Sequence, residues 1–285
     1  MATLQFNLPS ITWQRRKPVS RSNLRPVQCA AERQELFDRI APVYDNLNDL
    51  LSLGLHRVWK RMAVSWSGIE VFYSFVREEI WKKLKIYALV VSNRAREGDT
   101  VLDVCCGSGD LAFLLSEKVG IKGKVIALDF SREQLQVAES RQQERLKACY
   151  KNIEWVEGNA VDLPFSDSTF DAATVGYGLR NIIDRHKGMM EMSRVLKPGS
   201  KVSVLDFNKN TDPFTTSIQE WLLDNVVVPV ASGYDLASEY QYLKNSIREY
   251  LTGDELEKLA LESGFSAAKH FEMNFGLMGN LVATR

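Results

Sequence analysis

The stretch Val101–Leu115, which reads VLDVCCGSGDLAFLL, decides the fold of this chain. Its short apolar run, interrupted by Asp103, predicts a buried strand, and the apolar spacing from Leu111 onward predicts a helix. Between them lie Gly107 and Gly109, and glycine permits a tight turn and close approach of a ligand to the backbone. A strand, a glycine-rich turn and a helix together predict the first unit of a nucleotide-binding α/β fold.

Strands and helices continue to alternate downstream of this unit. Strand–helix–strand connections within one sheet are right-handed, so this order predicts a Rossmann-like, mostly parallel sheet. The further predicted strands are Lys124–Phe130, Asn152–Ala160, Phe170–Leu179 and Lys201–Phe207, and the predicted helices are Leu111–Val119, Arg132–Tyr150 and His186–Leu196.

Other segments flank this alternating region on both sides. Helix-spaced apolar residues predict N-terminal helices within Glu32–Val64, and a helical lid is predicted across Phe214–Tyr250. The T-x-x-E pattern at Thr252 predicts a capping box that starts a helix. A final pair of strands is predicted within Ala267–Thr284.

Asp103 discriminates between two classes of nucleotide ligand. The run Gly107–Ala112, GSGDLA, formally fits a dinucleotide motif, but that match alone is weak. A carboxylate four residues before Gly107 would repel a pyrophosphate, whereas it suits the ammonium and sulfonium of S-adenosylmethionine. Asp129, 20 residues after Gly109, ends the second predicted strand, where an acid can accept hydrogen bonds from ribose hydroxyls in either class.

The composition excludes some classes of protein. Lysine and arginine number 36, as do aspartate and glutamate, so the net charge is zero and nothing indicates a nucleic-acid partner. No run of 18 uncharged apolar residues predicts a membrane span.

The first 30 residues differ from the rest of the chain. They contain five arginines and lysines and no acidic residue, and they lack the apolar core of a secretory signal. This composition predicts an organelle transit peptide over residues 1–30, with a plastid favoured over a mitochondrion. Residues 31–285 are then expected to form a single domain.

The cysteines and histidines have no spacing that suits a metal. Cys105 and Cys106 are adjacent and cannot readily bridge each other, and Cys29 and Cys149 stand alone. We therefore expect neither a metal site nor a structural disulfide. Cys105 and Cys106 are expected to be small packing residues beside the nucleotide site.

Three stretches resemble signatures of the menaquinone/ubiquinone biosynthesis C-methyltransferase family. They are YDNLNDLLSLGLHRVWK (Tyr44–Lys60), GYGLRN (Gly176–Asn181) and RVLKPG (Arg194–Gly199). The segment around Asn159 and Ala160 resembles the adenine-contacting segment of class I methyltransferases. The resemblance implies the class I S-adenosylmethionine-dependent methyltransferase fold and methylation of a ring carbon of a lipophilic prenylated quinol.

The resemblance also suggests roles for individual residues. Arg180, Asn181 and Tyr44 are the expected catalytic residues, and Tyr177 is expected to contact the substrate. Arg180 remains protonated at neutral pH, so it would stabilise a developing phenolate or polarise a water rather than act as a base. The expected cofactor-binding residues are Asp103, Gly107, Ser108, Gly109, Asp129, Asn159, Ala160 and Gly176.

Several alternatives stay open at the level of the sequence. The quinol ring is a naphthoquinol in the plastid branch of the family and a benzoquinol in the mitochondrial branch. An NAD-dependent oxidoreductase and a non-catalytic scaffold are the competing classes. Peripheral membrane contact is expected because the substrate lies in lipid, and a homodimer is an open possibility. Residues 69–96 interrupt the family pattern, and we interpret them as a retained intron in preference to an extra amphipathic helix.

Overall fold

The structure is a computed structural model that describes residues 97–209, 237–273 and 276–285, together with eight single residues between 60 and 64 and between 213 and 225. These are Lys60, Arg61, Val64, Pro213, Thr216, Ser217, Trp221 and Asn225. The predicted transit peptide, the insertion at 69–96, Tyr44 and most of the predicted lid lie outside the described residues.

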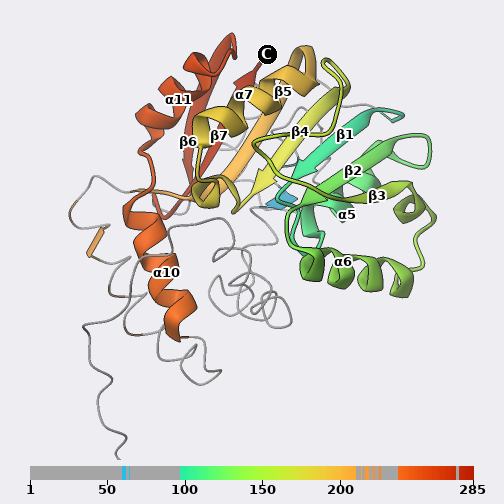
Figure 1. Ribbon diagram of the computed structural model, residues 1–285, viewed down its shortest axis with the longest axis horizontal. Helices are drawn as coiled ribbons and strands as arrows, with labels where there is room; N and C mark the ends of the chain where they lie inside the picture. Colours follow the sequence, from blue (N-terminus) through green and yellow to red (C-terminus); the bar gives the residue numbers. More distant parts are fainter. Residues whose placement is uncertain are drawn as a thin grey trace, which may run out of the picture.

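A seven-stranded sheet in the order β3-β2-β1-β4-β5-β7-β6 forms the centre of the molecule (Figure 1). β1 to β5 run parallel to one another, while β7 pairs antiparallel with both β5 and β6. The predicted mostly parallel sheet is confirmed. The strands are β1 (Thr100–Val104), β2 (Lys124–Asp129), β3 (Ile153–Glu157), β4 (Phe170–Gly176), β5 (Leu196–Phe207), β6 (Ala267–Met273) and β7 (Met278–Thr284).

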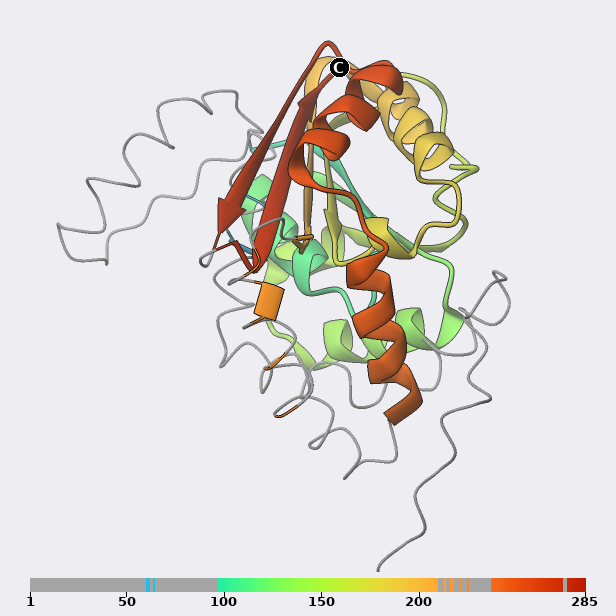
Figure 2. The ribbon, with the colours of Figure 1, turned by 90° about the vertical axis from the view of Figure 1, so that its left-hand side faces the viewer.

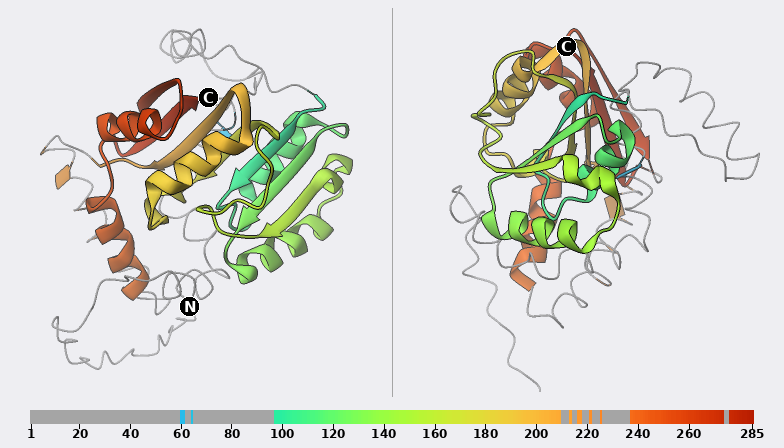
Figure 3. Two further views of the ribbon diagram at one scale, coloured as in Figure 1. Left: turned by 45° about the horizontal axis from the view of Figure 1, so that its top comes forward. Right: turned by 90° about the vertical axis from the view of Figure 1, so that its right-hand side faces the viewer.

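Helices cover both faces of the sheet (Figures 2 and 3). Apolar residues of α5 pack against one face, and those of α7 and α11 pack against the other. α10 lies beyond the carboxyl end of β4 (Figure 1). The helices are α5 (Asp110–Val119), α6 (Arg132–Glu144), α7 (Arg185–Val195), α10 (Ala237–Arg248) and α11 (Gly253–Glu262), with short 3-10 helices η2 (Ala148–Asn152) and η3 (Leu179–Asn181).

The burial of β1 explains its sequence. Val101, Leu102 and Val104 are fully buried, because helices cover both faces of a parallel sheet. Asp103 is equally buried and is the one charged residue of this strand. A carboxyl group in such a position is costly, so its presence points to a function beyond packing.

Several element boundaries differ from the sequence prediction, among them the end of the strand predicted over Phe170–Leu179, which ends at Gly176. The helix predicted over Arg132–Tyr150 ends at Glu144, and the residues after it form the separate η2. Pro198 and Gly199, which precede the strand predicted over Lys201–Phe207, are part of β5, where the register with β4 shifts between Phe170 and Ala172. Gly199 can occupy this irregularity because its φ is +81°. The capping box of Thr252 and Glu255 is confirmed.

Candidate active site

A cavity of about 410 Å³ lies at the carboxyl ends of β1, β2 and β4. This edge of a parallel α/β sheet is where ligands bind in such folds. Its wall includes most of the residues predicted to bind the cofactor, namely Gly107, Ser108, Asp129, Asn159, Ala160 and Gly176, and also Tyr177 and Asn181. The fold therefore brings together residues that are far apart in the sequence.

The turn after β1 is held in an open shape by glycines. Gly107 has φ +52° and Gly109 has φ +89°, values that favour glycine. A Cβ atom on Gly109 would lie 2.5 Å from the ring of Trp155. Gly109 is thus required by the turn itself, and it does not line the cavity.

Two residues that are not glycine also adopt positive φ beside the cavity. Cys105 has φ +56° and Tyr177 has φ +60°. They lie after β1 and β4, which are neighbouring strands, and a Cβ atom on Gly178 would lie 2.4 Å from the Cβ of Cys105. Such conformations cost about 1–3 kcal/mol each and cluster at ligand sites. The strain lies where the backbone must leave room for a ligand.

Asp129 and Asn159 are fixed at the end of the cavity near β2 and β3. Oδ2 of Asp129 accepts a hydrogen bond from the backbone N–H of Gly107 (2.8 Å), and Oδ1 accepts one from Ser131 (2.9 Å). Oδ1 of Asn159 accepts one from the backbone N–H of Val161 (3.1 Å). These bonds give both side chains a defined orientation at the cavity wall.

Asp103 lies in the sheet behind the cavity and is not part of its wall. Oδ1 accepts a hydrogen bond from the hydroxyl of Thr174 (2.7 Å), whereas Oδ2 has no hydrogen-bond partner among the described residues. Burial raises the pKa of Asp103 to about 7, although the Thr174 hydroxyl and the charge of Lys60 oppose the shift. At neutral pH this carboxyl group is poised between its neutral and charged forms.

A group of charges on α5, α6 and the segment before β1 was missed by the sequence analysis. Nζ of Lys60 lies 2.6 Å from Oδ2 of Asp110, and a guanidinium nitrogen of Arg141 lies 2.7 Å from Oδ1. Arg141 also donates to the hydroxyl and carbonyl oxygens of Ser108 (both 2.8 Å). Burial raises the pKa of Asp110, but the charges and hydrogen bonds of Lys60 and Arg141 outweigh burial and hold this pKa well below its usual range. Lys60 ends the signature Tyr44–Lys60, and this position was the only feature of the sequence that could have indicated its place in the site.

The guanidinium of Arg180 turns away from the cavity. It donates to Oδ1 of Asp206 (2.5 Å) and to the carbonyl oxygen of Tyr177 (2.8 Å), in a pair that is almost fully buried. Asn181 does line the cavity, and its side chain donates to that same carbonyl (3.1 Å) and accepts from the hydroxyl of Tyr242 in α10 (2.9 Å). Arg180 therefore contacts the cavity wall through the Tyr177 backbone, and its catalytic role remains a prediction.

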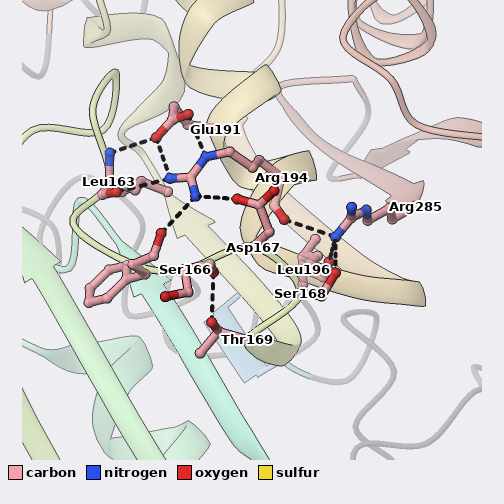
Figure 4. Close-up of polar contacts among 10 residues, drawn as sticks. Leu163, Ser166, Asp167, Ser168, Thr169, Glu191, Arg194, Leu196 and Arg285 are labelled. Carbon is pink, nitrogen blue, oxygen red and sulfur yellow. Dashed lines mark hydrogen bonds and ion pairs between the residues drawn. The ribbon is translucent and has the colours of Figure 1, made fainter.

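Arg194, in the predicted signature RVLKPG, secures the loop that follows Asn159 (Figure 4). Its guanidinium donates to the carbonyl oxygens of Leu163 and Phe165 and pairs with Glu191 and Asp167. Glu191 also accepts from the backbone N–H of Leu163 (2.8 Å). This network fixes the far side of the segment that holds Asn159 at the cavity.

The cysteines of the described region are free thiols. Burial raises the pKa of Cys105 and Cys106 well above the usual range, so both stay uncharged. In the ranges that the structure describes, no three histidine, cysteine or acidic side chains gather as a metal site. Within the same ranges every helix is too short or too polar to cross a membrane.

Comparisons with known sequences show which proteins the chain resembles. The sequence profile of the ubiE/COQ5 methyltransferase family matches residues 27–71 and 66–285. The chain is 59% identical over 287 residues to the chloroplastic 2-phytyl-1,4-beta-naphthoquinone methyltransferase of Arabidopsis thaliana, covering 100% of each. It is 43% identical over 250 residues to the 2-phytyl-1,4-naphtoquinone methyltransferase of Nostoc sp., covering 88% of this chain and 97% of the other.

Solved structures share the fold at low sequence identity. A SAM-dependent methyltransferase from Thermotoga maritima has a TM-score of 0.55 and 16% identity, covering 88% of this chain and 98% of the other. Phosphoethanolamine N-methyltransferase 2 of Haemonchus contortus has a TM-score of 0.51 and 17% identity, covering 84% and 60%.

Proposed function

The chain belongs to the ubiE/COQ5 methyltransferase family, and from this membership we propose that it methylates a ring carbon of a prenylated naphthoquinol, with S-adenosylmethionine as donor. The substrate would be demethylphylloquinol and the product phylloquinol, the last methylation of vitamin K1 synthesis. The observation that carries the proposal is 59% identity over the whole chain to a naphthoquinone methyltransferase.

The polar groups at the cavity support S-adenosylmethionine as its ligand. Asp129 would accept the ribose hydroxyls, Asn159 and Ala160 would contact the adenine, and the open turn at Gly107 would admit the methionine portion. Asp103 lies behind the cavity wall, so its carboxylate would attract the ligand ammonium through its charge and without direct contact; its buried Oδ2 has no hydrogen-bond partner among the described residues. When bound, this donor supplies an electrophilic methyl group on a sulfonium that is already a good leaving group.

The protein would contribute positioning, desolvation and control of the phenolic proton. A quinol hydroxyl has a pKa on the order of 10, and its loss places electron density on the ring carbon that attacks the methyl group. The new C–C bond forms as the C–S bond breaks, and the ring carbon then releases its proton. Asn181 and Tyr177 line the cavity where the ring would lie, and Arg180 would orient both through the Tyr177 carbonyl.

Location and partners are also proposals, and the relatives bear only on the location. The chloroplastic relative supports import of this protein into a plastid, and residues 1–30 would be removed on import. A substrate with a phytyl tail lies in lipid, so we propose peripheral contact with a plastid membrane. A homodimer stays a proposal that gel filtration would test.

Two assays test the proposed function. Calorimetry with S-adenosylmethionine and with NADH separates a methyltransferase from an oxidoreductase. A methyltransferase should bind S-adenosylmethionine and not NADH, and an oxidoreductase should bind NADH. A methylation assay then compares reduced 2-phytyl-1,4-naphthoquinol with a benzoquinol that has a polyprenyl tail. Preference for the benzoquinol would contradict the proposal, and binding without turnover on either quinol would favour a scaffold.

A further inference from the structure

Lys60 is a buried cation in the cavity wall that the proposed mechanism does not use. Its side chain is 7% exposed, and its ammonium lies 2.6 Å from Asp110 and 5.8 Å from the centre of the Tyr177 ring. An ammonium group has three N–H donors, and among the described residues that of Lys60 forms one hydrogen bond, to Oδ2 of Asp110. Buried charged groups are normally fully hydrogen-bonded, so the remaining donors indicate a ligand on the cavity side.

The three charged side chains that meet at Asp110 carry one positive charge in excess. Lys60 and Arg141 share the single carboxylate of Asp110, which is also the first residue of α5. Asp103 faces Lys60 as well, but its pKa of about 7 leaves it only partly charged at neutral pH. The positive end of the α5 dipole adds to this excess. An anionic group entering the cavity here would balance these charges.

The position of Lys60 along the cavity indicates which part of the ligand Lys60 would contact. Asn159 follows β3 and Asp129 ends β2, and the adenine and ribose would lie there. Lys60 instead contacts Asp110, which follows β1, and Tyr177, which follows β4. The two groups therefore lie at opposite ends, and the amino-acid portion of the donor extends towards Lys60.

We propose that Lys60 binds the carboxylate of the methionine portion of S-adenosylmethionine, while Asp110 holds the lysine in place. This inference rests on the proposed function. It separates the two opposite charges of the donor: Lys60 binds the carboxylate, and the charge of Asp103 behind the cavity wall attracts the ammonium. Asp110 is a positioning residue in this arrangement, because its own carboxylate would repel that of the ligand.

Two ligands that differ only in the carboxylate test the proposal by calorimetry. Decarboxylated S-adenosylmethionine keeps the sulfonium and the ammonium but lacks the carboxylate. Wild-type protein should prefer S-adenosylmethionine, and Lys60→Met should weaken its binding about 10- to 100-fold, as expected for loss of a charge-assisted hydrogen bond. Binding of the decarboxylated ligand should change less than about threefold, which also shows that the variant is folded, and Lys60→Arg should recover part of the preference.

Arg141→Met is the matched control, because it removes the other cation from Asp110 and Arg141 does not line the cavity. It should affect both ligands alike. Equal effects of Lys60→Met on the two ligands, or unchanged binding with a lower kcat, would overturn the assignment. Wild-type protein that binds neither ligand would instead reject the proposed function itself.

Discussion

The clearest test of the fold and site together is the pH dependence of Asp103. Burial raises the pKa of its carboxyl group from 3.8 in the unfolded chain to about 7 in the folded protein. A raised pKa means that this group favours folding fully at low pH, and that its contribution is lost as pH rises from about 4 through 7. Replacing Asp103 with Asn removes this dependence, because an amide does not titrate.

The magnitude follows from the two pKa values. Between pH 5 and pH 8 the ionisation of Asp103 should lower the free energy of unfolding by about 2.5 kcal/mol, at 1.36 kcal/mol per pKa unit. Asp103→Asn leaves a buried amide N–H₂ near the position of Oδ2, at a cost of about 1–3 kcal/mol. That cost is the same at both pH values, so the difference between them isolates the carboxyl group.

The assay is urea unfolding of wild type, Asp103→Asn and the exposed control Asp162→Asn, each at pH 5 and pH 8. The wild type and the control should lose about 2.5 kcal/mol more than Asp103→Asn over this interval. The reasoning would be refuted if wild type and Asp103→Asn lost the same free energy of unfolding between pH 5 and pH 8 to within about 0.5 kcal/mol. Such a difference is well below the shift derived from the pKa of Asp103. Asp103→Asn should also weaken S-adenosylmethionine binding, with wild-type affinity rising as pH increases through 7.

Three further predictions concern the supports of the site. Arg180→Ala should lower the free energy of unfolding in urea by about 3–5 kcal/mol, because it leaves Asp206 buried without a counter-ion. Adding Asp206→Ala should recover part of that loss, and a cost of Arg180→Ala below about 1 kcal/mol would contradict a buried pair. Arg194→Ala should speed hydrogen exchange in the loop that its guanidinium binds and weaken S-adenosylmethionine binding several-fold, whereas unchanged exchange would show that the loop holds itself. Gly109→Ala should lower thermal stability more than Gly98→Ala, since both have positive φ but only Gly109 faces a ring at 2.5 Å; equal losses would exclude the steric contact.

The sequence by itself determined the order of strands and helices and the edge of the sheet at which the cavity lies. Alternating apolar runs and glycine-rich turns are local patterns, and parallel strands place their carboxyl ends at one edge. Asp129, Asn159 and Gly176 each follow or end a strand, so the sequence was enough to predict their meeting. The predicted acid of β1 was also found in the sheet, although it lies behind the cavity wall.

Only the tertiary structure decided where the long polar side chains point. Lys60 and Asp110 are 50 residues apart, and no local pattern reports a contact at such a separation. Arg180 lies in a motif next to the cavity, yet its guanidinium turns to Asp206, 26 residues further along the chain. A buried charge is oriented by whichever counter-ion the fold brings to it, because leaving it unpaired costs more than any local preference can offset.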